Sequence, residues 1–181
     1  VLPEVKTRRF IDVWDAGCAH GPEPYSLAIV MREVLGPFLF RNVRIFATDI
    51  EEHGSFGEII REGVYPEAEL KRIPRELFRR HFEPNGKPGH FQLTREIRKS
   101  VLYQRHDLLS LKPIRTGFSL VVCKNVLLHF TEEERAAVVQ MFHRALDEGG
   151  FLATEHTQKL PPGTEHLFRP VAPYVKIFRK V

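Results

Sequence analysis

The sequence predicts an α/β fold, a doubly wound sheet that is mostly parallel, with an antiparallel C-terminal strand and a small inserted antiparallel β subdomain. Three observations predict it. Short apolar runs of strand length alternate with segments whose apolar residues recur at helical spacing. A turn with two glycines joins the first run to the first helical segment. A basic segment in the middle of the chain then interrupts the alternation.

The first two elements are a strand and a helix. Residues 10–16 form an apolar run that ends in the glycine turn. Pro22 and Pro24 suit a first helical turn, because the N–H that proline lacks has no partner there. Residues 36–37, Gly-Pro, predict the helix end. Between them, apolar residues recur at helical spacing at Leu27, Val30, Met31 and Val34.

The later elements follow the same alternation. The segment 67–105 departs from it, with a basic helix from Pro74, a turn at 85–89 and two short strand-like runs, 91–94 and 101–104. We therefore expect a core formed by residues 1–66 and 106–181 and an inserted subdomain at 67–105. The remaining core elements are strands at 43–48, 118–123, 151–154 and 174–178, a helix at 55–61 stopped by Gly63, and a helix from a capping box at Thr131–Glu134 to Gly149–Gly150.

Composition excludes several classes of protein. With 181 residues and 43% hydrophobic side chains, the chain can bury one core, and its glycine and proline contents exclude collagen-like repeats. The longest apolar run, residues 27–31, is too short for a membrane span, so we expect no membrane insertion. Only Cys18 and Cys123 are present, which favours a reducing cytoplasmic setting, no disulfide, and two small buried side chains. A valine start so close to the first strand suggests an omitted upstream segment.

The turn after the first strand predicts a nucleotide-like ligand. Glycines allow the backbone to approach a ligand, and the following helix N-terminus offers unpaired N–H donors. Gly17 and Gly21 lack the spacing of the dinucleotide fingerprint, which argues against an oxidoreductase. Asp49 ends the neighbouring strand, where a carboxylate can accept hydrogen bonds from a ribose diol, although a simple turn and a helix cap would leave the same pattern. Together, the two features indicate adenosine.

The residues 13–28, VWDAGCAHGPEPYSLA, resemble the first motif of the CheR-type chemotaxis-receptor methyltransferases, including Glu-Pro-Tyr-Ser at 23–26. The resemblance continues in register through 47–50, 63–65, 107–109 and 124–126. It implies a Rossmann-like methyltransferase that uses S-adenosylmethionine, yields S-adenosylhomocysteine, and methylates glutamate side chains on the cytoplasmic helices of chemoreceptors. The implied cofactor-binding residues are Ala16, Gly17, Cys18, Gly21, Glu23, Asp49, Ile50, Asp107, Leu108, Asn125 and Val126.

The implied chemistry demands little acid–base help. A glutamate side chain ionises near pH 4.3, at about its ordinary pKa, and is already nucleophilic at neutral pH. The protein must therefore supply alignment rather than a general base. A carboxylate at Glu23 suits the ammonium and sulfonium groups of the cofactor.

Two features depart from the family pattern. His129 stands where the family usually has a tyrosine near the transferred methyl group, and it is our candidate catalytic residue, a hydrogen-bond donor to the acceptor carboxylate. A residue that simply opens the next helix is the alternative. No match appears to the upstream Phe-Phe-Arg motif or to the helical N-terminal domain. These departures keep two rivals open: a non-catalytic signalling module that binds the cofactor or its product, and a methyltransferase with another acceptor.

Two further groups of residues bear on ligands and partners. His20, His129 and His156 follow strands but lack the spacing of paired ligands, so we expect no metal site. The basic segment 71–105 coincides with the insertion that contacts receptors in the family, and it would attract acidic helices or another acidic protein. A solvated basic face is the alternative, and sparse aromatic residues argue against nucleic acid.

Overall fold

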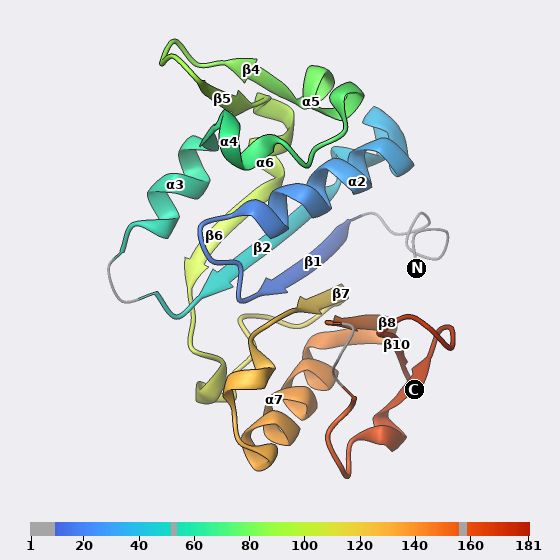
Figure 1. The fold of residues 1–181 in the computed structure, drawn as a ribbon. Helices are drawn as coiled ribbons and strands as arrows, with labels where there is room; N and C mark the ends of the chain where they lie inside the picture. The colour runs from blue at the N-terminus through green and yellow to red at the C-terminus, as the bar shows by residue number, and fades with distance from the viewer. Residues whose placement is uncertain (1–9, 52–53, 156–158) are drawn as a thin grey trace.

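A computed structural model describes residues 10–51, 54–155 and 159–181. Its centre is a seven-stranded sheet in the order β6-β2-β1-β7-β8-β10-β9 (Figure 1). The first five strands of this order run parallel, and β10 and β9 add antiparallel pairings at one edge. The strands are β1 (Ile11–Ala16), β2 (Val43–Asp49), β6 (Val101–Arg105), β7 (Phe118–Cys123), β8 (Leu146–Thr154), β9 (Phe168–Pro170) and β10 (Ile177–Lys180).

Helices cover both faces of the sheet. All six residues of β1 are buried, as expected for a central parallel strand. Ile11 and Val13 pack in one hydrophobic cluster with α2 (Pro22–Phe40), whereas Trp14 packs in the other with α7 (Glu132–Ala145). The predicted doubly wound α/β fold is therefore confirmed, with α2 and α7 on opposite faces (Figure 1).

Helix termini follow the sequence signals closely. The capping box at residues 131–134 is present, since Thr131 Oγ1 accepts from Glu134 N and Glu134 Oε2 accepts from Thr131 N. The helix α3 (Phe56–Glu62) ends at Gly63, as predicted. In α2 the regular helix is interrupted at Gly36, and one further turn carries it to Phe40.

A second, three-stranded antiparallel sheet lies beside the large one (Figure 1). The predicted helix after Pro74 is present, and Phe78 stacks on Phe82 at 5.3 Å between ring centroids. Two short 3₁₀ helices, η1 (Leu108–Ser110) and η2 (Leu127–His129), follow β6 and β7, and η3 (Glu165–Leu167) precedes β9. The elements in and around the small sheet are β3 (Val64–Pro66), α4 (Glu67–Leu70), α5 (Arg75–His81), β4 (Phe82–Pro84), β5 (His90–Leu93) and α6 (Arg95–Ser100).

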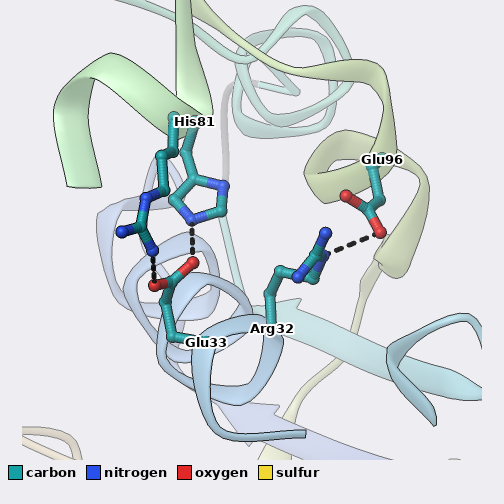
Figure 2. A network of polar contacts seen from close by, with 5 residues as sticks. Arg32, Glu33, His81 and Glu96 are labelled. Atoms are coloured by element: carbon teal, nitrogen blue, oxygen red, sulfur yellow. Dashed lines mark hydrogen bonds and ion pairs between the residues drawn. The ribbon is translucent and has the colours of Figure 1, made fainter. Parts of the chain in front are cut away.

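Side chains of α2, in the core, form hydrogen bonds with α5 and α6, the helices next to the second sheet (Figure 2). Glu33 Oε1 lies 2.9 Å from Nε2 of the buried His81, at the end of α5. Arg32 Nε donates to Glu96 Oε1 of α6 at 2.8 Å. The His81 contact holds the pKa of Glu33 below its ordinary value, and burial only partly opposes it. Ionised Glu33 therefore favours this arrangement.

Three details of the sequence analysis were wrong. The run 101–104, assigned to the insertion, belongs to β6, which extends the large sheet because its backbone pairs in parallel with the edge of β2, from Ile45↔Val101 to Asp49↔Arg105. The helix α7 ends at Ala145 rather than at Gly149, because Leu146 is already extended and pairs with Phe118. The C-terminal strand begins at Ile177, and Tyr174 is 88% exposed. The division into two domains stays a prediction.

Within the described residues, no helix combines the length and the apolar character that a membrane span requires.

Candidate functional site

The glycine turn lies where β1 and β2 end side by side. Gly17 N and Cys18 N both donate to Thr48 O, at 2.8 and 3.0 Å, which ties the turn to the end of β2. Gly21 N donates to Cys18 O at 3.1 Å, and α2 begins at the next residue. The turn therefore connects the carboxyl ends of two strands to a helix N-terminus, the place where doubly wound sheets bind ligands.

Packing explains why this turn needs its glycines. Gly17 has φ +104°, and a Cβ there would lie 2.0 Å from Val126 Cγ2. Gly21 has φ +106°, and a Cβ there would lie 2.6 Å from the hydroxyl of Tyr65. Both positions exclude any side chain, for conformational and steric reasons. Gly17 thus allows the loop after β7 to pack against the turn, and Gly21 allows Tyr65 to do so.

Asp49 joins the turn from the neighbouring strand. Its Oδ2 accepts from Ala19 N at 2.9 Å, and its Oδ1 accepts from Glu51 N at 3.2 Å. Each carboxylate oxygen can accept a further hydrogen bond, so the pair retains capacity for a ribose diol. Ile50, next in the chain, is 56% exposed and offers an apolar surface beside that carboxylate.

Glu51 supports this loop, and the sequence analysis missed it. Its Oε1 accepts from the backbone N of Ser55 and of Phe56 and from the Ser55 hydroxyl, and its Oε2 accepts from the Tyr103 hydroxyl at 3.1 Å. Burial alone would raise the pKa of Glu51, but these hydrogen bonds keep it below the ordinary value. The sequence did contain one signal for this role: a glutamate shortly before a predicted helix can accept hydrogen bonds from the first N–H groups of that helix.

The loops after β6 and β7 complete the rim. Asp107 Oδ1 accepts from Leu109 N at 2.9 Å and caps η1, while His106 N donates to Asp49 O at 2.9 Å. Asn125 has φ +58°, and its N donates to Glu155 Oε2 at 3.2 Å. Asp49, Asp107 and Asn125 therefore lie on loops that follow the ends of β2, β6 and β7, at the same edge of the sheet as the glycine turn.

Some predicted site residues lie in the core instead. Ala16, Cys18 and Leu108 are buried in the hydrophobic clusters of the core. Both cysteines are free thiols, and burial raises the pKa of the Cys123 thiol well above its ordinary value. His129 lies at the end of η2 with an exposed side chain, three residues beyond Val126, which packs on Gly17.

Carboxyl groups cluster beneath the N-terminus of α2. Glu23 Oε2 accepts from Lys124 Nζ at 2.7 Å, but its buried Oε1 has no hydrogen-bond partner among the described residues. Asp15, which is 0% exposed, also lacks a donor for either oxygen within that part of the chain. Burial raises the pKa of Asp15 well above its ordinary value, and the neighbouring Glu23 charge raises it further. Sequence reasoning missed Asp15, although an aspartate within an apolar strand was a visible signal.

A cavity of about 640 Å³ lies between α2 and the sheet. Apolar residues such as Ile11, Val13 and Leu120 line it, with Glu23 and Lys124 as charged members. It therefore adjoins the predicted cofactor residues at Glu23 and extends away from them along β1 and β7.

No group of three or more metal-binding side chains occurs in residues 10–51, 54–155 and 159–181. His20 Nε2 lies 3.8 Å from Glu69 Oε2, and its ring packs near Phe56. His156, the third histidine considered, lies outside the described residues.

The residues at this edge fit S-adenosylmethionine. Asp49 has acceptor capacity for ribose hydroxyls, and the exposed Ile50 offers an apolar surface of the kind that an adenine ring needs. The orphaned oxygens of Glu23 and Asp15 need donors of the kind that an ammonium group carries. The donors, acceptors and charges thus match the parts of this cofactor.

Comparison with known proteins identifies the family. Residues 1–176 match the family model described as CheR methyltransferase, SAM binding domain. The chain is 36% identical over 154 residues to a chemotaxis protein methyltransferase of Listeria innocua, covering 84% of this chain and 56% of that protein. It is 33% identical over 172 residues to chemotaxis protein methyltransferase 1 of Pseudomonas aeruginosa, covering 89% and 61%. The chain thus spans little more than half the length of these relatives.

Solved structures support the fold. A TehB-like SAM-dependent methyltransferase from Corynebacterium glutamicum superposes with a TM-score of 0.51 at 14% identity, covering 99% of this chain and 83% of that one. Similarity at this level of identity concerns the fold alone. The match to the family model over residues 1–176, together with the relatives, establishes that the chain belongs to the CheR methyltransferase family and comprises its S-adenosylmethionine-binding domain.

Proposed function

We propose that this protein acts in the cytoplasm and transfers the methyl group of S-adenosylmethionine to glutamate carboxylates on the cytoplasmic helices of chemoreceptors. The observation that carries the proposal is the junction of three loops, in which Ala19 N donates to Asp49 and Val126 packs on Gly17. This junction gathers the family's cofactor motifs at one edge of the sheet. The relatives named chemotaxis protein methyltransferase support the choice of acceptor.

Each side chain has a role in this proposal. Asp49 would accept hydrogen bonds from the ribose, Ile50 and the η1 loop opened by Asp107 would flank the adenine, and Glu23 would bind the ammonium group. When bound, the cofactor supplies an electrophilic methyl group. The Asn125–Val126 loop would border the methyl group and the acceptor oxygen.

The acceptor carboxylate needs no general base, because it is ionised at neutral pH. Alignment of the reacting atoms and exclusion of water are therefore the main contributions required. His129 is exposed beyond the Val126 loop, where a ring N–H could donate to the acceptor carboxylate and hold it in place. In this proposal His129 orients the acceptor carboxylate through a hydrogen bond and neither takes up nor releases a proton.

The basic face supports an acidic protein acceptor. A cleft of about 500 Å³ between α3, α6 and β6 is lined by Arg61, Arg95, Arg98 and Lys99. Arg98 is fixed there by donating from Nε to Leu93 O at 3.0 Å. The many glutamates of a receptor helix would be attracted to such a surface.

The test is methyl transfer from radiolabelled S-adenosylmethionine to a receptor cytoplasmic fragment. We expect base-labile methyl esters, and we expect fewer of them when acceptor glutamates are replaced by alanine. Cofactor binding without ester formation would favour a signalling module that only binds S-adenosylmethionine or S-adenosylhomocysteine. Ester formation on unrelated proteins, but not on the receptor, would favour another acceptor.

A further inference from the structure

The glycine turn after β1 is a strained segment that depends on contacts with other elements. Its backbone is left-handed at Gly17 and Gly21 and also at Ala19, which has φ +46°. Alanine rarely adopts this conformation, because its Cβ comes too close to the next carbonyl oxygen. Such a conformation persists only where the surrounding structure restrains it. The contacts that restrain the turn therefore decide its shape, and with it the shape of the cofactor site.

Restraints on the turn come from both sheets. In the large sheet, Thr48 O accepts hydrogen bonds from the first two residues of the turn, and Asp49 Oδ2 accepts from Ala19 N. In the small sheet, the hydroxyl of Tyr65 donates to His20 O at 2.9 Å. Tyr65 is 5% exposed, and burial raises the pKa of its hydroxyl, so the group remains a protonated donor. The small sheet thus holds one carbonyl group of the turn.

The Tyr65 contact fixes a whole peptide unit. His20 O and Gly21 N belong to the same planar peptide group, so a donor that holds the oxygen also sets the direction of the N–H. Gly21 N donates to Cys18 O at 3.1 Å, which holds the other side of that group. A Cβ at Gly21 would lie 2.6 Å from the Tyr65 hydroxyl, so the contact is also closely packed. Because α2 begins at the next residue, the start of this helix depends on the orientation of that peptide.

The local sequence directs the Tyr65 side chain towards the turn. The left-handed Gly63 ends α3, and β3 follows at once as an edge strand of the small sheet. The ring of Tyr65 packs edge-on against Tyr25 of α2, with 6.2 Å between the centroids, and belongs to the same hydrophobic cluster. A second contact of the same region, from Glu69 Oε2 to His20 Nε2 at 3.8 Å, joins two half-exposed side chains and contributes little. Tyr65 is therefore the stronger of these two links between the insertion and the turn.

We propose that Tyr65 is a positioning residue for the cofactor site, through which the small sheet holds the glycine turn in the conformation that binds S-adenosylmethionine. Tyr65 acts through the backbone of the turn and does not itself touch the cofactor. The inference goes beyond the proposed function, since it concerns cofactor binding alone and is independent of the acceptor. It makes the small sheet a part of the cofactor site.

A purely structural role for Tyr65 would give a different result. Its hydroxyl would then stabilise the fold as any buried hydrogen bond does, and the folded protein would bind the cofactor unchanged. Thr164 provides a matched comparison, because it is 0% exposed and its Oγ1 donates to Pro161 O at 2.7 Å, just before η3. Tyr65→Phe and Thr164→Val each remove one buried hydroxyl that donates to a backbone carbonyl. Only the first of these carbonyls belongs to the glycine turn.

The experiment is isothermal titration calorimetry of the full chain and both variants with S-adenosylmethionine. We expect Tyr65→Phe to weaken the cofactor about fivefold, the equivalent of one hydrogen bond, and Thr164→Val to leave its affinity within about twofold. Urea denaturation should show a loss of stability in both variants. A Tyr65→Phe variant that loses stability but binds S-adenosylmethionine as the wild type does would overturn the inference.

A measurement on the wild type keeps the test decisive if Tyr65→Phe does not fold. Coupling between two sites is reciprocal, so a cofactor that needs the restrained turn must also stabilise the Tyr65 contact, by up to the same factor of about five. S-adenosylmethionine should therefore slow amide hydrogen exchange in β3 and β5 as well as in the turn, with β9 as the internal reference. Slower exchange in the turn alone would overturn the inference and leave the proposed function intact. A wild type that does not bind S-adenosylmethionine would overturn both.

Discussion

Replacing Gly17 by alanine should damage both folding and cofactor binding, because two separate penalties meet at this position. Its φ of +104° is one that side chains rarely adopt. The new Cβ would also lie 2.0 Å from Val126 Cγ2, 3.3 Å from Val126 Cβ and 3.8 Å from its Cγ1. Either the turn or the loop after β7 must move, and both belong to the proposed site.

The two penalties can be separated with a matched control. Gly86, in the turn between β4 and β5, has φ +87°, and a Cβ added there would meet no described atom within 4 Å. Gly86→Ala therefore carries only the backbone penalty, about 1 to 2 kcal/mol. Gly17→Ala adds overpacking, about 1 to 3 kcal/mol. We therefore expect Gly17→Ala to lose about 2 to 5 kcal/mol of unfolding free energy, clearly more than the control.

Urea denaturation measures the stability, and calorimetry with S-adenosylmethionine measures the site. A double variant with Val126→Ala removes the overlapping Cγ2, so it should recover about 1 to 2 kcal/mol relative to additivity. Cofactor affinity should fall in Gly17→Ala but not in Gly86→Ala. Equal losses of stability in the two glycine variants, with no coupling to Val126, would refute the steric argument.

Three other perturbations test neighbouring features. Asp49→Asn should weaken S-adenosylmethionine and methylthioadenosine alike, by about 1.5 to 3 kcal/mol, since the ribose is common to both; unchanged calorimetric affinities would exclude the ribose contact. Thr131→Ala should cost about 1 kcal/mol in urea denaturation through loss of the capping box, with Ser26→Ala, which leaves α7 untouched, as the control. Folding lowers the pKa of Glu33. The ionised side chain should therefore stabilise the fold above pH 4.5, and this stabilisation should disappear as the pH falls through the pKa that Glu33 has in the folded protein. Glu33→Gln should therefore flatten the acid limb of a stability-versus-pH curve, and an unchanged limb would contradict the assignment.

Local sequence signals predicted the parallel core because the central strands β1 and β7 are apolar runs that are buried almost throughout. The capping box and Gly63 fixed helix ends through contacts within a few residues. The errors arose where long-range pairing decides. The sequence of residues 101–104 would suit an edge strand in either the large or the small sheet. Only the pairing with β2 assigns this strand to the large sheet. Leu146 leaves the helix early because Phe118 offers it a partner.

The site shows the same division. Gly17 and Asp49 were predicted from their places at the ends of two strands, whereas Asn125 was predicted only from the family resemblance. The support from Glu51 depends on Tyr103, which lies far along the chain, and no local pattern reveals that contact. Asp15 was visible as an acid in an apolar strand, but its missing donors are a property of the folded chain alone.

The proposed cofactor site carries acidic side chains, whereas the proposed acceptor surface carries basic ones. The cofactor is cationic at its methionyl end, and the carboxyl groups of Asp15, Glu23 and Glu155 gather where β1 and β8 end and α2 begins. Those same groups would repel a glutamate acceptor that approaches the methyl group. An acidic acceptor therefore needs compensating attraction elsewhere, and we propose that the cleft lined by Arg61, Arg95, Arg98 and Lys99 supplies it. If this account is correct, neutralising those four residues should raise the KM for an acidic acceptor steeply at low salt, while S-adenosylmethionine affinity stays the same. A parallel loss of cofactor affinity would show instead that the cleft supports the fold of the site.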